Sequence, residues 1–130
     1  MDPFQKYKST ALTTGDSVRQ LLFVLDEVIK LLHIAKKALG EKDYETKFNT
    51  ISKITDVFYI LRTGVDLEKG GEAIRTLDNF YASTIYNLER ANLKAETPED
   101  LDVILNAIIL VRDSIKNEVD NPSVGEQQSN

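Results

Sequence analysis

Apolar residues recur at three- and four-residue spacing in four separate segments of this chain, and no other feature constrains its fold as strongly. This period matches one face of an α-helix, whereas no segment shows the alternation of apolar and polar residues typical of a half-buried strand. Each stripe therefore predicts a helix that turns one face to a common core. The stripes are Leu21, Leu22, Leu25, Val28, Ile29, Leu32, Ala35 and Leu39; Tyr44, Phe48, Ile51, Ile54, Phe58, Leu61 and Val65; Ile74, Leu77, Phe80, Tyr81, Ile85, Leu88 and Ala91; and Leu101, Ile104, Leu105, Ile108, Val111, Ile115 and Val119.

Helix start and stop signals separate these segments. Asp16 is expected to cap the first helix, and Gly40 to end it in a left-handed conformation. Gly70 and Gly71 are expected to form a tight turn between the second and third helices. Thr97 is expected to cap the fourth helix, because a proline occupies the first helical position and acidic residues follow it.

Short connections between helices of similar length favour antiparallel neighbours. The predicted fold is therefore all-α, an antiparallel up-down-up-down four-helix bundle over residues 16–119. We expect residues 1–15 to form an N-terminal arm. Residues 120–130 are polar and interrupted by proline and glycine, so we expect a disordered, flexible C-terminal tail.

Composition narrows the functional classes. The chain of 130 residues carries a net charge of −5, and such an acidic surface repels phosphate backbones, so nucleic acid is not expected as a partner. It contains no cysteine, which rules out disulfides and thiolate metal sites. The chain shows neither a secretory signal nor an apolar run of the roughly 20 residues that span a membrane. We expect a cytoplasmic protein without direct membrane insertion.

The residues offer no constellation for catalysis. His33 is the single histidine of the chain, and a carboxylate-bridged metal bundle requires a Glu-x-x-His motif on facing helices. Lys30 stands three residues before His33, which lies on the polar side of its helix. The pair Gly70-Gly71 is not followed by the lysine of a phosphate-binding loop. We therefore expect no enzyme activity, no cofactor and no metal.

Several apolar residues remain once the four stripes are assigned. They are Phe23, Val24, Leu31 and Ile34 on the first helix, Ile60 on the second, Tyr86 on the third, and Val103 and Leu110 on the fourth. Scattered exposed apolar residues are normal, and a helix in a bundle can be buried on more than one side. The alternative is that these residues form a groove or patch that binds a partner helix. We favour this alternative for the seven residues other than Val24.

Three further residues stand apart from the stripes. Phe4 and Tyr7 are isolated aromatic residues in the N-terminal arm, where they could cover an apolar groove in the free protein. Asn92 falls at the edge of the core, where a buried amide needs hydrogen-bond partners. We expect Asn92 to fasten the turn between the third and fourth helices.

Four short motifs, in this order, resemble those of the flagellin-specific export chaperones of the FliS family. The arm Phe4-Gln5-Lys6-Tyr7 matches the Tyr-x-x-Tyr arm of that family. The run VDLEKGGEA matches its turn between the second and third helices, LERANLKAE contains its Ala-Asn pair at Ala91 and Asn92, and Arg112 matches a recurrent basic position. The family's Leu-Tyr-Asp-Gly-Ala-Ile segment appears here as residues 24–29, VLDEVI, without its tyrosine and glycine.

The resemblance implies a cytoplasmic export chaperone built as a helical bundle. Such a protein binds the disordered C-terminal segment of flagellin in apolar grooves, prevents premature polymerisation and delivers the client to the flagellar export apparatus. The implied partners are flagellin, an export-gate protein contacted through the arm with Phe4 and Tyr7, and a second regulator of flagellin. The alternative that the residues leave open is a generic helical-bundle regulatory or adaptor protein that binds another protein.

Overall fold

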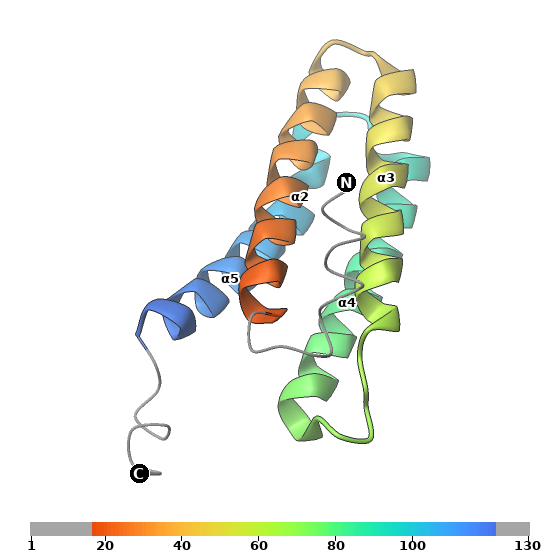
Figure 1. The fold of residues 1–130 in the computed structure, drawn as a ribbon. Coiled ribbons are helices and arrows are strands. Elements are labelled where there is room, and N and C mark those ends of the chain that lie inside the picture. Colours follow the sequence, from red (N-terminus) through yellow and green to blue (C-terminus); the bar gives the residue numbers. More distant parts are fainter. Residues whose placement is uncertain (1–16, 122–130) are drawn as a thin grey trace.

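The computed structural model of the chain describes residues 17–121, and all of its regular structure is helical (Figure 1). The helices are α2 (Ser17–Gly40), α3 (Tyr44–Thr63), α4 (Gly71–Lys94), the short 3-10 helix η1 (Pro98–Leu101) and α5 (Asp102–Asp120). Successive long helices run antiparallel through short connections. The prediction of an all-α four-helix bundle is confirmed. The expected arm at residues 1–15, the Asp16 cap and the end of the expected tail lie outside the described residues.

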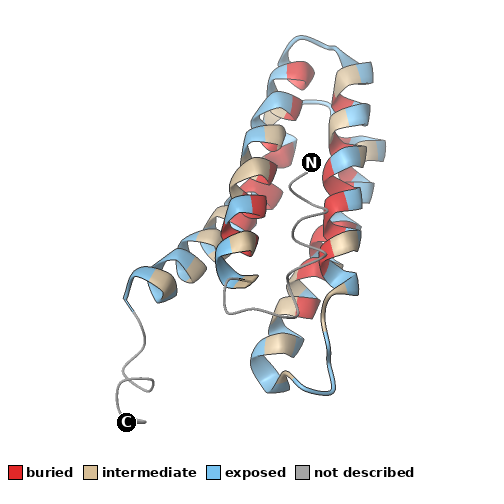
Figure 2. Ribbon diagram, viewed as in Figure 1, coloured by how far each residue is buried: buried red, intermediate tan, exposed pale blue. Residues whose placement is uncertain are grey.

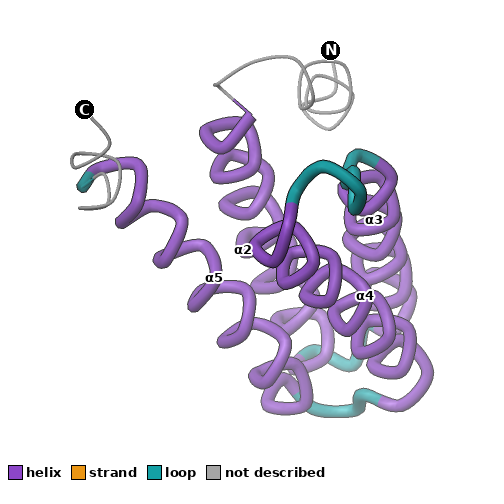
Figure 3. Tube along the Cα trace, turned by 90° about the horizontal axis from the view of Figure 1, so that it is seen from below, coloured by secondary structure: helices purple, strands orange, loops and turns teal. Residues whose placement is uncertain are grey.

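The order of the helices around the core is α5, α2, α3, α4. α2 packs against α3 on one side and against α5 on the other, and α4 packs against α3. The contact between α4 and α5 is sparse, and Figure 3 shows α5 leaning away from the other helices. Among residues 17–121, the bundle is therefore closely packed along three seams and is open along the fourth.

The core lies between the inner faces of the helices, where Figure 2 shows the buried residues in red. Leu25, Leu32 and Ile108 are fully buried there. The ring centroid of Phe58 lies 6.0 Å from those of Phe80 and Tyr81 in two edge-on pairs, which join α3 to α4. Since each large apolar side chain removed from water stabilises the fold by about 1.5–3 kcal/mol, these faces determine the arrangement of the helices.

Three of the core assignments made from the sequence were wrong. Tyr44 and Phe48, placed in the core, are 50% and 54% exposed. Val24, placed outside the stripe, is 1% exposed. The reason for Val24 is that α2 has neighbours on both sides, so its buried face is wider than one stripe. Tyr44 and Phe48 lie in the first two turns of α3, and Phe48 lines a surface hollow that α3 shares with α4.

The connections differ from expectation in one place. Gly40 is the last residue of α2, and the left-handed residue is Lys42, with φ of 57°. Asp43 then caps α3, where its carboxylate accepts a hydrogen bond from the Thr46 N–H at 3.1 Å. Hydrogen bonds from the side chain and from the backbone N–H of Thr46 lower the pKa of Asp43. At the next connection Gly71 has φ of 63°, a value that favours glycine, as the predicted turn requires.

Candidate functional site

The open seam between α4 and α5 exists because α5 is fastened to α2 instead. Arg112 donates from Nε to Asp26 Oδ1 at 2.7 Å, and the ammonium group of Lys36 pairs with Asp102. Arg112 also donates to Asp113. The hydrogen bonds to Asp26 and Asp113 raise the pKa of Arg112, which keeps this link charged. The two ion pairs stand ten residues apart on α5 and fix which side of that helix faces α2.

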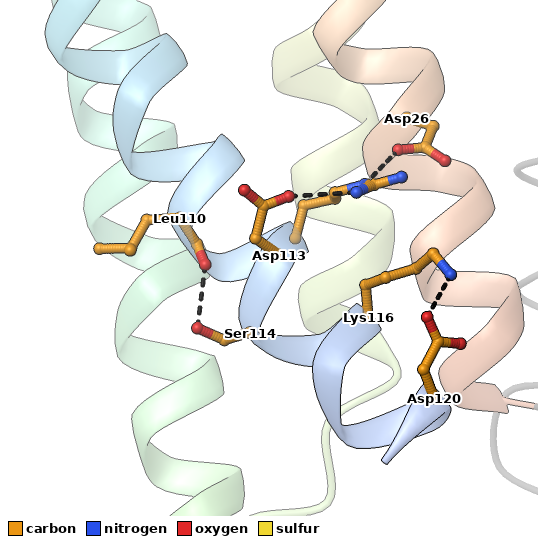
Figure 4. A network of polar contacts seen from close by, with 7 residues as sticks. Asp26, Leu110, Asp113, Ser114, Lys116 and Asp120 are labelled. Atoms are coloured by element: carbon orange, nitrogen blue, oxygen red, sulfur yellow. Dashed lines mark hydrogen bonds and ion pairs between the residues drawn. The ribbon is translucent and has the colours of Figure 1, made fainter.

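The opposite side of α5 carries exposed apolar side chains. Leu110 precedes Arg112 by two residues, which turns it about 200° around the helix. Figure 4 shows Leu110 pointing away from Asp26. Leu110 is 69% exposed, and Val103, two turns earlier, is 76% exposed. The side of α5 that is not attached to α2 is therefore an apolar face without a covering helix among the described residues.

We use the term α4–α5 cleft for the hollow beside this face. It has a volume of about 450 Å³ and is lined by Asn87, Arg90, Ala91, Lys94, Ala95, Asp100, Val103 and Ile104. Small residues form its α4 wall, since Ala91 and Ala95 stand one turn apart. A backbone can approach such a wall closely. The cleft thus has apolar side chains beside polar ones in its lining and has space for side chains of a partner.

The rim of the cleft is positive at one end. Arg90 and Lys94 line it from α4. The carboxylate of Asp100 is engaged elsewhere, because its Oδ2 accepts hydrogen bonds from the backbone N–H groups of Glu96 at 2.9 Å and Thr97 at 3.0 Å. These two hydrogen bonds lower the pKa of Asp100. The two cations are therefore available to carboxylates of a partner, although the whole chain is acidic.

The residues predicted to form one binding patch lie on different sides of the bundle. Val103 and Leu110 lie on the α4–α5 side. Phe23, Leu31 and Ile34 share one face of α2, about a third of a turn away from the side that contacts α5. Ile60 of α3 stands level with Phe23, because α2 and α3 run antiparallel. Leu31 and Ile60 are half-buried, and Leu31 packs against the core.

Tyr86 of α4 is 62% exposed and does not line the α4–α5 cleft. Of the predicted binding residues, only Val103 lines the cleft, and Leu110 is exposed two turns further along the same face of α5. Phe4 and Tyr7 lie outside the described residues.

The sequence-based prediction missed the α4 wall of the cleft. Arg90, Lys94 and Ala95 were not singled out, and Ala91 was assigned only to the core stripe and to the Ala-Asn pair, although the four residues form a pattern. Two cations and two small residues repeat at four-residue spacing, which places each pair on one face of a helix. Small residues next to cations at the end of a helix are a pattern that could have indicated the site.

Asn92 fastens different elements from those expected. Its Nδ2 donates to the Phe48 carbonyl oxygen at 3.3 Å and to Ser52 Oγ at 3.0 Å. Both acceptors belong to α3, so the amide links α4 to α3 and does not bind the turn before the fourth helix. Thr97 precedes η1 as its N-cap, with Pro98 at the first position, as the sequence indicated.

The described residues give no indication of a catalytic or metal centre. Between Ser17 and Asn121, no group of three histidine, cysteine, aspartate or glutamate residues could hold a metal ion. His33 is exposed on α2. Within the same part of the chain, no helix has both the length and the apolar character needed to cross a membrane.

Comparison with known protein families identifies the family of this chain. The model of the family described as "Flagellar protein FliS" matches residues 1–117. No curated protein matches the chain. Because the family match covers nine-tenths of the 130 residues, the chain belongs to the FliS family. This membership gives it the general role of a flagellar export chaperone, with flagellar proteins as partners, in a family not known for enzyme activity.

Proposed function

We propose that this FliS-family chain is a cytoplasmic chaperone that binds the disordered C-terminal segment of flagellin in apolar grooves. Binding prevents premature polymerisation of the client, which is then delivered to the flagellar export apparatus. One observation carries the proposal. The seam between α4 and α5 is open, and Val103 and Leu110 are exposed on the helix that borders it.

The geometry of the cleft suits an amphipathic helix. Val103 and Leu110 are seven residues apart and line one side of α5, so a client helix with apolar residues at matching spacing would bury both. Each side chain kept from water contributes on the order of 1.5–3 kcal/mol. The small side chains of Ala91 and Ala95 allow the client backbone to come close, and Arg90 and Lys94 would pair with its carboxylates.

A disordered client loses conformational entropy when it becomes a helix, so one short contact gives limited affinity. A client that continues around the bundle gains further contacts. The α2 face with Phe23, Leu31 and Ile34, together with Ile60 of α3, is the proposed continuation of the binding surface. Phe4 and Tyr7, outside the described residues, are proposed to contact the export-gate protein. A second regulator of flagellin is a further proposed partner.

A matched pair of leucine substitutions tests the cleft. Leu110→Ser removes an exposed apolar side chain from the face of α5 beside the cleft, and Leu93→Ser removes one from the opposite side of α4. We expect Leu110→Ser to weaken binding of the C-terminal segment of the host's flagellin by about tenfold, which corresponds to about 1.4 kcal/mol. Leu93→Ser should leave that affinity unchanged. Isothermal titration calorimetry measures the affinity, and circular dichroism follows the gain of helix by the client.

Both variants should keep the thermal unfolding midpoint of the parent chain, since both leucines are largely exposed. Absence of a complex between the parent chain and the flagellin segment would refute the chaperone proposal. A complex whose affinity is the same in the Leu110→Ser variant would place the client away from the exposed face of α5.

A further inference from the structure

A second hollow lies on the other side of α4. We call it the α3–α4 groove. It has a volume of about 380 Å³ and is lined by residues of α3 and α4, among them Phe48, Asp56, Tyr59, Glu89, Asn92 and Leu93. Asn92 lines this groove and its neighbour Ala91 lines the α4–α5 cleft. The two hollows therefore stand on opposite sides of one helix, and the groove is separate from the proposed client site.

The groove exposes apolar side chains at both of its ends. Phe48 and Tyr59 are about half exposed, and Leu93 is 83% exposed. Phe48 precedes Tyr59 by eleven residues, which corresponds to about 16 Å along α3. Leu93 stands level with Phe48, since the amide of Asn92 bonds the Phe48 carbonyl oxygen. A helix of about three turns would span these two apolar ends.

Acidic side chains stand between the apolar ends. Asp56 and Glu89 line the groove, and none of the eight residues that line it is a lysine or arginine. Tyr59 donates from its hydroxyl to Glu89 Oε2 at 3.1 Å. This hydrogen bond raises the pKa of Tyr59, so the phenol is a neutral donor and the negative charge of the groove lies on its two carboxylates. The middle of the groove is thus suited to a cationic side chain.

The floor of the groove has an acceptor without a donor. The Phe48 carbonyl can only accept a hydrogen bond, so the nitrogen of the Asn92 amide must face it. This orientation leaves Asn92 Oδ1 buried, with no hydrogen-bond partner among the described residues. A buried acceptor that lacks a partner is unfavourable. An ammonium or guanidinium group held over the acidic middle could supply the missing donor after a small shift of side chains.

We propose that the α3–α4 groove binds a helical segment of another protein that carries lysine or arginine between two aliphatic residues. The aliphatic residues, about three turns apart, pack on Phe48 with Leu93 at one end and on Tyr59 at the other. The cations between them pair with Asp56 and Glu89. Since the groove and the cleft lie on opposite sides of α4, this partner and the client bind at the same time.

A second copy of the chain is the less suitable occupant. The outer face of α2 carries Phe23 and Ile34 eleven residues apart, with Lys30 between them. This face could enter the groove of a neighbour. However, such a contact is head-to-tail and leaves a free face and a free groove at each end. It would join copies into open chains, so a different protein matches the groove better.

A short synthetic peptide tests the proposal with the full chain. The probe is a labelled helical peptide of about 14 residues, with leucine at positions i and i+11 and lysine at i+4 and i+7, all on one face. A control peptide carries glutamate in place of both lysines. We expect fluorescence anisotropy to show binding of the lysine peptide and an affinity at least about tenfold weaker for the glutamate peptide.

The chain variants locate the binding site. Leu93→Ser and Asp56→Asn should each weaken binding of the lysine peptide by about tenfold, whereas Leu110→Ser should leave it unchanged. Failure of the lysine peptide to bind, equal binding of the two peptides, or loss of binding in Leu110→Ser alone would overturn the proposal. Concentration-dependent self-association of the parent chain that Leu93→Ser abolishes, measured by sedimentation, would identify a second copy as the occupant instead.

The result of this test is independent of the flagellin experiment. Binding of the lysine peptide should depend on Leu93, and binding of the flagellin segment should depend on Leu110. Each substitution is therefore the control for the other. Loss of one interaction with retention of the other therefore distinguishes failure of the groove proposal from failure of the proposed chaperone function.

Discussion

Lys47 shows how one cation can complete the end of a helix. It is 6% exposed, and its Nζ donates to the Asn92 carbonyl oxygen at 2.8 Å. The last carbonyl groups of a helix lack partners within that helix. Here the N–H of Glu96, which could have served Asn92, bonds Asp100 instead. Lys47 supplies the missing donor at the negative end of the α4 dipole, although burial lowers its pKa.

The Asp100 carboxylate makes the fold sensitive to acid. Its pKa in the folded chain is below the ordinary value of 3.8, so its contribution to stability is present above that value and is lost as the pH falls through the folded pKa. We predict that Asp100→Ala lowers the thermal unfolding midpoint by a few degrees at pH 7. The difference from the parent chain should shrink as the pH falls below 3.8. A difference that stays constant down to pH 2 would contradict this prediction.

Connections between elements explain where sequence patterns succeed and fail. The pair Gly70-Gly71 indicated a turn, and Gly71 indeed adopts positive φ. Gly40 indicated a left-handed end of α2, yet the chain continues for two residues and uses Lys42. The pattern places a helix end to within about two residues. It does not determine which residue adopts the left-handed conformation, because that depends on how α3 must start.

Two substitutions in these connections should change the free energy of unfolding in opposite directions. Lys42→Gly should raise the free energy of unfolding by about 1 kcal/mol, because a side chain with a Cβ is strained at positive φ. Gly71→Ala should lower it by about 1 kcal/mol for the same reason. The site itself has space, since a Cβ at Gly71 would meet no atom within 4 Å. Urea denaturation measures both changes, and equal signs would contradict the explanation.

At the scale of the whole molecule, the fold was predictable and the binding surface was not. Helical period alone gives the four helices and most of their buried residues. The period cannot tell which seam of the bundle is closed. Val103 and Leu110 are on the surface because α5 attaches to α2. Phe48 is exposed because it lies in the first turns of α3, next to the point where α4 ends. These outcomes depend on contacts between residues far apart in the chain, such as Asp26 with Arg112.

Two aspartate substitutions on α5 distinguish its faces. Ile108 is fully buried and Val103 is 76% exposed, five residues earlier on the same helix. Ile108→Asp places an unpaired charge in the core and should destabilise the chain by more than about 4 kcal/mol, which unfolds most domains of this size. Val103→Asp should stay folded and lose affinity for the flagellin segment. Far-UV circular dichroism checks both, and a folded Ile108→Asp variant would contradict the assignment of the core.

The α2–α5 seam has a consequence for the order in which the chain folds. The side chains of Asp26 and Arg112 are 86 residues apart in sequence, and those of Lys36 and Asp102 are 66 apart. Contacts across such long loops carry a larger loop-closure entropy than those between α3 and α4, and non-local contacts slow folding. During synthesis α2 leaves the ribosome long before α5. The side of α2 that contacts α5 therefore stays uncovered until the last helix has been made. The α2–α5 contact, and with it the α4–α5 cleft, forms only when nearly the whole chain is complete.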